Sequence, residues 1–316
     1  MDSTISQIEK LNSEIPEEVM KRAKDAIRED ETTKEQMLDQ FKHWVSKNNN
    51  LQDVRTDDNF LLRFLRTKKY SLPMAQDMLL KYLNLRQTYQ YLAFNMDFLE
   101  PSVLELVNKG YLFPSPIKDK NGRTVIIGTS EPFDPHRYTH IDMTKMHGIT
   151  YECLLEDEQN QILGFTHFGD IKHASPAHLT IWSPIEFPRA YRWAEQSMPM
   201  MHKEIHLYKL PAPLRYTYEL LKNLMSTKIR ERIMLHDTLE ELHGKLDPKV
   251  LPKEYGGIIP MADMIELWKF QLVEKRDRIL ALDKMKLLDN SCLMKKAKSN
   301  KNQEIDVGSF RKLAID

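Results

Sequence analysis

Basic side chains gather between residues 198 and 236, the stretch of the sequence best suited to bind an anion. Seven Lys and Arg residues there outnumber three Glu, whereas the whole chain has 46 basic and 46 acidic residues and a formal net charge of zero. A local cationic field on a neutral protein favours a specific anionic surface or headgroup over bulk nucleic acid. A solvated helical face is the alternative explanation for the same charges.

Residues that would support catalysis or bind a metal are sparse. His136 and His140, and likewise His202 and His206, are four residues apart, as zinc ligands on one helical face are. Pro135 precedes the first pair and the second runs into an expected strand, so neither pair is predicted to bind a metal. No phosphate-binding Gly-rich loop, nucleophile elbow or dinucleotide-binding turn occurs. We therefore expect a protein that is not an enzyme and that has no cofactor.

The composition is that of an ordinary folded protein, with 316 residues, of which 41% are apolar and 29% charged. No run approaches the ~20 apolar residues needed to cross a bilayer, and the N-terminus has no signal-peptide pattern. Two distant cysteines, Cys153 and Cys292, exclude a disulfide framework and favour the cytoplasm. Seventeen methionines suit an adaptable apolar lining, although ordinary core filling explains them equally.

The N-terminal part of the chain predicts a small helical domain after a polar, flexible segment at residues 1–16. Apolar residues recur there at helical spacing, and Thr33 and Gln36 have the spacing of a capping box. The expected helices cover residues 17–29, 33–47, 57–66 and 73–91.

From about residue 110, turn signals alternate with short apolar runs, which predicts an α/β domain with a largely parallel sheet. Asp170 ends one of the expected strands, and turn capping explains it better than catalysis does. The expected strands cover residues 124–127, 163–168 and 205–208. The expected helices cover residues 147–161, 214–225, 227–236 and 261–284, with one more around Phe187 and Tyr191. The tail from Lys284 is expected to be mobile.

Five short motifs occur in an order that resembles the CRAL-TRIO lipid-transfer family. They are Phe60-Leu61-Leu62-Arg63-Phe64-Leu65-Arg66, Met198-Pro199, Ile205-His206, Lys228-Ile229-Arg230-Glu231-Arg232-Ile233 with His236, and Leu251-Pro252-Lys253-Glu254-Tyr255-Gly256-Gly257. The similarity covers residues 17–269 and is greatest to the tocopherol- and retinaldehyde-binding branch, particularly its insect members.

The resemblance implies a helical N-terminal lobe followed by an α/β lobe that encloses one hydrophobic molecule. The implied divisions are a flexible N-terminus (1–16), a helical domain (17–95), the lipid-binding domain (96–270), and a helix end with a mobile basic tail (271–316). The helix at residues 211–225 corresponds to the family's mobile gate over the cavity, with Pro211 and Pro213 at its hinge. Its apolar residues are Leu214, Tyr218, Leu221 and Met225.

The same resemblance implies a basic cleft for phosphoinositide headgroups at Lys68, Lys203, Lys228 and Arg232. A further basic position of that cleft is occupied by Met201, so headgroup affinity or preference is expected to differ. The pocket positions of the branch correspond to Thr144, His147, Tyr151, Phe165, Trp182, Ala190, Trp193, Ala194, Met200 and Ile205.

Two tryptophans, Trp182 and Trp193, are expected to narrow the pocket, and His147 or Tyr151 to hydrogen-bond a polar tip of the cargo. Packing of an ordinary core is the alternative role for these side chains.

The expected function is that of a soluble, monomeric carrier that moves one hydrophobic lipid, such as a retinoid, carotenoid or tocopherol, to or from membranes. Its expected partners are the lipid and anionic, phosphoinositide-containing membranes, and no nucleic acid. The headgroup would stabilise the open gate and the cargo the closed one. The alternative is a phosphoinositide-recruited membrane-trafficking regulator or lipid sensor without net transfer.

Overall fold

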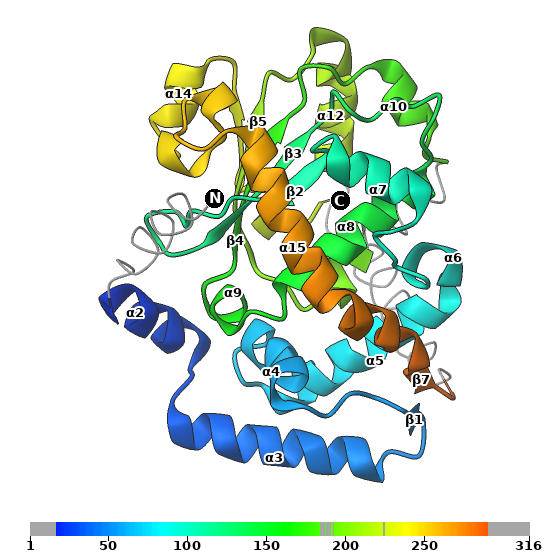
Figure 1. Cartoon of the computed structure of the whole chain (residues 1–316). Helices are drawn as coiled ribbons and strands as arrows, with labels where there is room; N and C mark the ends of the chain where they lie inside the picture. Colours follow the sequence, from blue (N-terminus) through cyan, green and yellow to red (C-terminus); the bar gives the residue numbers. More distant parts are fainter. Residues whose placement is uncertain (1–16, 184–186, 188–190, 192, 224, 290–316) are drawn as a thin grey trace, which may run out of the picture.

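Two helices of the N-terminal region, α3 and α4, begin at an aspartate that caps the helix through its side chain. The structure, a computed structural model, describes residues 17–183, 187, 191, 193–223 and 225–289 (Figure 1). In α4, Asp57 accepts a hydrogen bond from the Phe60 amide, and Phe60, Phe64 and Leu65 are fully buried. The N-terminal helices are α2 (Glu17–Ile27), α3 (Glu31–Lys47), α4 (Asp58–Thr67), α5 (Leu72–Thr88), α6 (Gln90–Ala93) and α7 (Pro101–Asn108).

The capping box predicted at Thr33 and Gln36 is wrong. Asp30 caps α3, and its carboxylate accepts hydrogen bonds from both the amide and the hydroxyl of Thr33, 2.8 Å each. Asp30 is as good an N-cap as a threonine, and starting there adds two further residues to the helix.

A five-stranded sheet forms the centre of the second domain, with strand order β2-β3-β4-β5-β6. β2 pairs antiparallel with β3 through the turn that begins at Asp119. The other three strand pairings of this five-stranded sheet are parallel. The largely parallel sheet of the sequence prediction is therefore confirmed. The strands are β2 (Leu112–Pro114), β3 (Thr124–Thr129), β4 (Phe165–Asp170), β5 (His202–Tyr208) and β6 (Ile233–His236).

Helices cover this sheet and connect its strands, with α15 crossing in front of it in Figure 1 and packing on α8 and β2. A capping box of Thr139 and Asp142 begins α8, seven residues before the predicted start. The longer helices are α8 (His140–Leu154), α9 (Glu158–Leu163), α12 (Arg215–Lys222) and α15 (Met261–Leu280). The shorter ones are α10 (Pro176–Thr180), α13 (Thr227–Arg230), α14 (Leu239–His243), the π-helical turn η1 (Trp193–Ser197) and the 3-10 turns η2 (Ala212–Leu214), η3 (Pro248–Val250), η4 (Lys253–Tyr255) and η5 (Ala281–Lys284).

Two further predictions about the second domain are wrong. The helix expected over residues 227–236 ends at Arg230, and the remainder forms strand β6 beside β5. The tail is ordered beyond Lys284, because β7 (Lys286–Leu287) pairs antiparallel with β1 (Leu51–Gln52). The rest of the predicted mobile tail, from residue 290, lies outside the described residues, as does the flexible N-terminus predicted at residues 1–16.

Buried charges fasten the helical region to the second domain. Arg63 on α4 is fully buried and donates to Glu152 of α8 at 2.8 Å and to Glu156 at 3.0 Å. Arg66 is 1% exposed; it donates to Gln161 of α9 at 2.8 Å and, within the helical region, to Glu29 at 2.8 Å. Burial removes the hydration water of each guanidinium group, and the hydrogen bonds and opposite charges of these carboxylates offset that desolvation cost.

Candidate functional site

A cavity of about 250 Å³ lies between the sheet and α8. Side chains alternate between the two faces of a strand, and Ile126 and Gly128 of β3 and Ile205 and Leu207 of β5 follow this spacing along the cavity. Its lining consists of Leu112, Ile126, Gly128, His147, Tyr151, His167, Phe168, Gly169, Tyr191, Glu195, His202, Ile205, Leu207 and Ile229.

Two glycines leave the space. Gly128 of β3 is the register partner of Gly169 of β4, so the sheet carries no side chain at two adjacent positions of its cavity face. Two residues earlier on each strand, Ile126 opposes His167, and their side chains fill the sheet surface. The hollow is therefore a direct consequence of residue type at matched positions.

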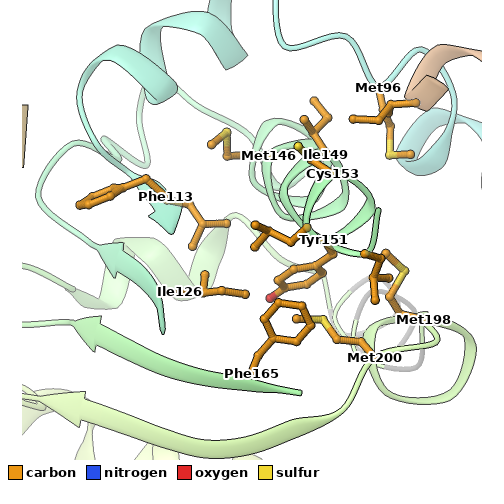
Figure 2. Close-up of a cluster of buried hydrophobic side chains, with 14 of the residues drawn as sticks. Met96, Phe113, Ile126, Met146, Ile149, Tyr151, Cys153, Phe165, Met198 and Met200 are labelled. Carbon is orange, nitrogen blue, oxygen red and sulfur yellow. The ribbon is translucent and has the colours of Figure 1, made fainter. Parts of the chain in front are cut away.

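Three of the ten predicted pocket residues, His147, Tyr151 and Ile205, line this cavity. Figure 2 shows the Tyr151 side chain reaching from α8 between Ile126 and Phe165. The buried residues Phe165, Met200 and Thr144 belong to the surrounding core.

The other predicted pocket residues lie elsewhere or are only partly described. Trp182 packs against His140, with 5.3 Å between ring centroids, and does not line the cavity. Trp193 and Ala194 lie in η1, and Ala190 is outside the described residues.

The polar part of the lining consists of three histidines, two tyrosines and one glutamate: His147, His167, His202, Tyr151, Tyr191 and Glu195. The hydroxyl groups of Tyr111 and Tyr151 lie 3.4 and 3.0 Å from the two ring nitrogens of His147. Nδ1 of His202 lies 2.8 Å from Nε2 of His167. The sequence prediction missed His167 and Tyr111 and considered His202 only as a metal ligand. Strand alternation was the available signal for His167, because it shares a face with Phe165 and Gly169.

The imidazoles of this cavity are neutral at physiological pH. Burial lowers the pKa of His147 to about 4. Burial, together with the positive charges of Arg232 and Lys228, lowers the pKa of His202 to about 4, although Glu195 opposes the shift. The pKa of His167 lies well below its ordinary value for the same main reason, burial.

The four residues predicted to bind a headgroup come from separate elements and influence one another electrostatically. Burial and the charges of Arg123, Arg232, Lys228 and Lys69 lower the pKa of Lys203 to about 8. Burial is the largest cause of the lowered pKa of Lys68, and the positive charge of Lys228 adds to it. Burial is also the largest cause of the lowered pKa of Lys228, and the positive charge of Arg232 is the next largest. We call Lys68, Lys69, Arg123, Lys203, Lys228 and Arg232 the basic cluster.

Mutual lowering of pKa values means that cations lie close together without full neutralisation, which is the condition of an anion site. Within the cluster, Arg123 pairs with Glu204 at 2.6 Å, and a guanidinium nitrogen of Arg232 donates to the carbonyl of His202. The sequence prediction missed Lys69 and Arg123. Met201, where a further cation was expected, accepts a hydrogen bond from Phe165 through its carbonyl and adds no charge.

The cavity and the basic cluster meet at α13. Ile229 lines the cavity, whereas its neighbour Lys228 belongs to the cluster. On the same border, Arg232 donates to the backbone of the cavity residue His202. The four-residue helix α13 therefore lies between the cavity and the basic cluster.

The helix predicted as a gate is shorter than expected. α12 ends at Lys222, so Met225 lies beyond it, because a turn at Asn223 ends the helix before that residue. Leu214 is buried, and Tyr218 and Leu221 are partly buried. The opposite face exposes 76% of Tyr216 and 51% of Leu220.

The residues set aside as catalytic or metal-binding have structural partners. A carboxylate oxygen of Asp170 accepts from the Lys172 amide at 3.0 Å, which is the predicted turn-capping role, and the other accepts from Tyr255 at 2.8 Å. His206 and His236 hydrogen-bond to each other at 3.0 Å. In the described part of the chain, no group of three or more His, Cys, Asp or Glu residues is arranged to hold a metal ion.

Comparisons with known proteins identify the class. Residues 108–257 match the CRAL/TRIO domain, and residues 30–103 match a helical unit described as a Pinta-like UBA domain. Clavesin-2 of Rattus norvegicus is 26% identical over 255 residues, covering 80% of this chain and 78% of the relative. Clavesin-1 of Xenopus laevis is also 26% identical over 255 residues, covering 80% and 77%.

The fold agrees with these matches. The crystal structure of Sfh5 superposes with a TM-score of 0.52 at 13% identity, covering 80% of this chain and 99% of that one. The protein thus consists of a helical N-terminal region followed by an α/β CRAL-TRIO domain with a mostly parallel sheet, and the matches support the CRAL-TRIO family. Over the described residues, no helix is long and apolar enough to cross a membrane.

Proposed function

We propose that this protein is a carrier that binds one hydrophobic lipid in the cavity behind α8 and exchanges it with membranes, while the basic cluster engages a phosphoinositide headgroup. A CRAL/TRIO domain implies a lipid-binding carrier rather than an enzyme. The observation that carries the proposal is the position of α13, which places Ile229 against the cavity and Lys228 in the basic cluster.

Apolar burial provides the energy for holding the cargo. At ~25 cal/mol per Å², hiding about 400 Å² of lipid contributes on the order of 10 kcal/mol before ordering costs. A lipid held this way leaves only through an opening. α12 is the proposed gate, and its exposed residues Tyr216 and Leu220 would contact the bilayer. Nearby cations would attract the anionic surface of that bilayer.

The finer parts of the proposal follow from the sequence resemblance. We propose that the cargo is a retinoid, carotenoid, tocopherol or related lipid, and that the protein is an insect member of the tocopherol- and retinaldehyde-binding branch. We further propose that it is a monomer that is cytoplasmic and transiently membrane-bound. The proposed division remains 1–16, 17–95, 96–270 and 271–316.

Neutralising two lysines of the basic cluster tests the membrane arm. Lys68 and Lys228 are chosen in preference to Arg232, because Arg232 also hydrogen-bonds to the backbone of the cavity residue His202. At ~1 kcal/mol per basic residue, the double Gln variant should bind phosphoinositide vesicles roughly 30-fold more weakly and transfer lipid more slowly, with cargo retained.

The matched control is the double Gln variant of the exposed residues Lys245 and Lys249, which changes the net charge equally beyond the opposite end of β6. Equal vesicle affinity in the two variants would contradict the role of the basic cluster.

Identification of the native cargo tests the carrier itself. The protein is purified gently from its own kind of cell, and the lipid extract is analysed by mass spectrometry. One hydrophobic molecule per protein, together with transfer between liposomes, supports the carrier. An empty protein that still binds anionic liposomes supports the second candidate, a phosphoinositide-recruited regulator or sensor, for which the clustered cations are the favouring observation.

A further inference from the structure

One cation of the basic cluster, Arg123, is held by an acid of the chain itself. We infer that Arg123 binds a phosphate group directly, and that Glu204 occupies its guanidinium until the phosphate displaces the carboxylate onto His206. This inference rests on the proposed function, in which the basic cluster engages a headgroup, and it identifies the exchange that admits a phosphomonoester.

A bulge in β5 places the acid beside the cluster. The register between β4 and β5 shifts where Thr166 pairs with Glu204, so that Lys203 is an extra residue of β5 opposite no residue of β4. A bulge of this kind redirects the side chains next to it. Gly164 leaves room for the redirected lysine, because a Cβ at this glycine would lie 2.9 Å from Cε of Lys203. Two consecutive residues, Lys203 and Glu204, therefore both reach the basic cluster.

Arg123 is the centre of the exchange. Nη1 of Arg123 donates to Oε1 of Glu204 at 2.6 Å, and the two side chains remain 18% and 31% exposed. After burial, the charge of Arg123 is the largest of those that lower the pKa values of Lys203 and Arg232, so it lies close to both. Within the described chain, Glu204 is the only residue that hydrogen-bonds to this guanidinium. A carboxylate offers a guanidinium the same kind of acceptor oxygens as a phosphate, and it thus marks the phosphate position.

His206 gives the displaced carboxylate a second donor. It follows Glu204 by two residues on β5 and is fully buried, and its Nε2 has no hydrogen-bond partner among the described residues. Oε2 of Glu204 lies 3.5 Å from this nitrogen. On the other side of the ring, Nδ1 lies 3.0 Å from Nε2 of His236.

The tautomer of His206 suits this role. When His236 donates to Nδ1 of His206, the hydrogen of the neutral ring is on Nε2 and faces Glu204. The opposite arrangement would set a nitrogen lone pair against a carboxylate oxygen. A small rotation of Glu204 therefore exchanges one donor for another, and the carboxylate is not left without a partner when it leaves Arg123.

A phosphomonoester is the anion that can drive the exchange. It carries a charge of about −1.5 to −2 at neutral pH and three strong acceptor oxygens, whereas the carboxylate carries one negative charge and two oxygens. The neighbouring cations Lys203 and Arg232 attract the additional charge. The phosphate therefore replaces Glu204 at a guanidinium that a weaker anion would leave paired.

Removal of the competing charge tests the inference. Glu204→Gln keeps the shape of the side chain and should tighten binding of soluble inositol 1,4,5-trisphosphate by about five- to tenfold in titration calorimetry of the full chain. Phosphatidylcholine vesicles that contain phosphatidylinositol 4,5-bisphosphate should show the same gain. The matched control is Glu231→Gln, which removes the same charge from an exposed residue next to Arg232. Within the described residues Glu231 forms no ion pair with Arg123, so its affinity change should stay below about twofold.

Two further measurements assign the gain to the exchange. In an Arg123→Gln background, Glu204→Gln should change the affinity no more than the control does, because the guanidinium for which it competes is absent. In nitrogen NMR of histidine-labelled protein, the headgroup should shift the Nε2 signal of His206 in the wild type and leave it in place in Glu204→Gln. A merely structural role of Glu204 would produce neither result.

The outcomes separate this inference from the proposed function. Unchanged or weaker headgroup binding by Glu204→Gln overturns the exchange and leaves the basic cluster as the anion site. Equal tightening in Glu204→Gln and Glu231→Gln also overturns it, since net charge then explains the effect. A gain confined to vesicles overturns it as well, because the soluble headgroup carries the same phosphates.

The two ligands also identify the source of the phosphate. A gain with both supports the exchange, and tighter binding of the vesicles than of the soluble headgroup assigns the phosphate to a membrane lipid. Failure of every protein to bind either ligand overturns the exchange together with the membrane arm of the proposed function. The native lipid extract then still decides the carrier.

Discussion

Acidification should destabilise the delipidated protein through its cavity histidines. The pKa values of His147 and His202 fall from 6.5 in the unfolded chain to about 4 in the fold. Between these values the unfolded state binds more protons, so stability is complete above pH 6.5 and is lost as the pH falls toward 4.

The size of the effect follows from the same values. From pH 6.5 to pH 5 is 1.5 pH units, which at 1.36 kcal/mol per unit costs about 2 kcal/mol for each histidine. Two histidines give about 4 kcal/mol, a large part of the 5–15 kcal/mol typical of a folded domain. With an unfolding entropy of ~2.1 cal/mol/K per residue, the melting temperature should fall by about 6 °C.

Thermal unfolding is measured by circular dichroism at pH 8, 7, 6 and 5. The double variant His147→Gln, His202→Gln keeps donors and acceptors and loses the titration of these two groups, so their share of the drop, about 6 °C, should disappear, while His167, whose pKa is also lowered, keeps its own contribution. The double Gln variant of the exposed residues His43 and His136 is the control. Ion-paired carboxylates such as Glu156, whose pKa is lowered, titrate below this range. The same drop in all three proteins would refute the reasoning.

Two other perturbations test the cavity and the buried pair of Arg66 and Glu29. Gly169→Val should fill the hollow, since a Cβ at this position lies 3.1 Å from a methyl carbon of Leu207. The amount of lipid bound per protein should fall in this variant, and Gly169→Ala should give an intermediate value. Full lipid occupancy in a folded Gly169→Val variant would contradict the assignment of the cavity as the lipid site. Arg66→Met should lower the free energy of unfolding by about 3–5 kcal/mol, because it leaves Glu29 buried and unpaired. Adding Glu29→Gln should restore much of the lost free energy of unfolding, as measured by urea titration. No loss of stability in the single variant would count against the buried pair.

The order of elements could be predicted from the sequence because local patterns determine them. The apolar run that begins at Thr124 predicted β3 correctly. β6 was missed, since Ile229 and Ile233 have helical spacing and only the pairing of Ile233 with Ile205 makes that segment a strand. Local periodicity carries no information about such a neighbour.

The candidate site was predictable only in part, because its residues meet through the fold. His147 and Tyr151 share one face of a helix, so their closeness is local. His167 reaches the same cavity through β4, and its contact with His202 depends on a register shift near Phe165 that no sequence spacing reveals. Arg123 joins the basic cluster in the same nonlocal way.

The pairing of β1 with β7 has a consequence for synthesis. The buried arginines of the helical region bind carboxylates that lie at increasing distances along the sequence. The separation is 37 residues for Arg66 with Glu29, 89 for Arg63 with Glu152 and 197 for Arg86 with Asp283. The pairing of Leu51 with Leu287 closes last. At about 5–20 residues per second, that partner leaves the ribosome roughly 12 to 47 s after Leu51.

The helical region therefore assembles on the nascent chain in stages, and its buried arginines acquire their carboxylates one after another. The cavity walls, which end with Ile229, are complete in sequence before β7 appears. A newly made chain thus contains the described residues that line the cavity before the partner of the final strand pairing has been synthesised.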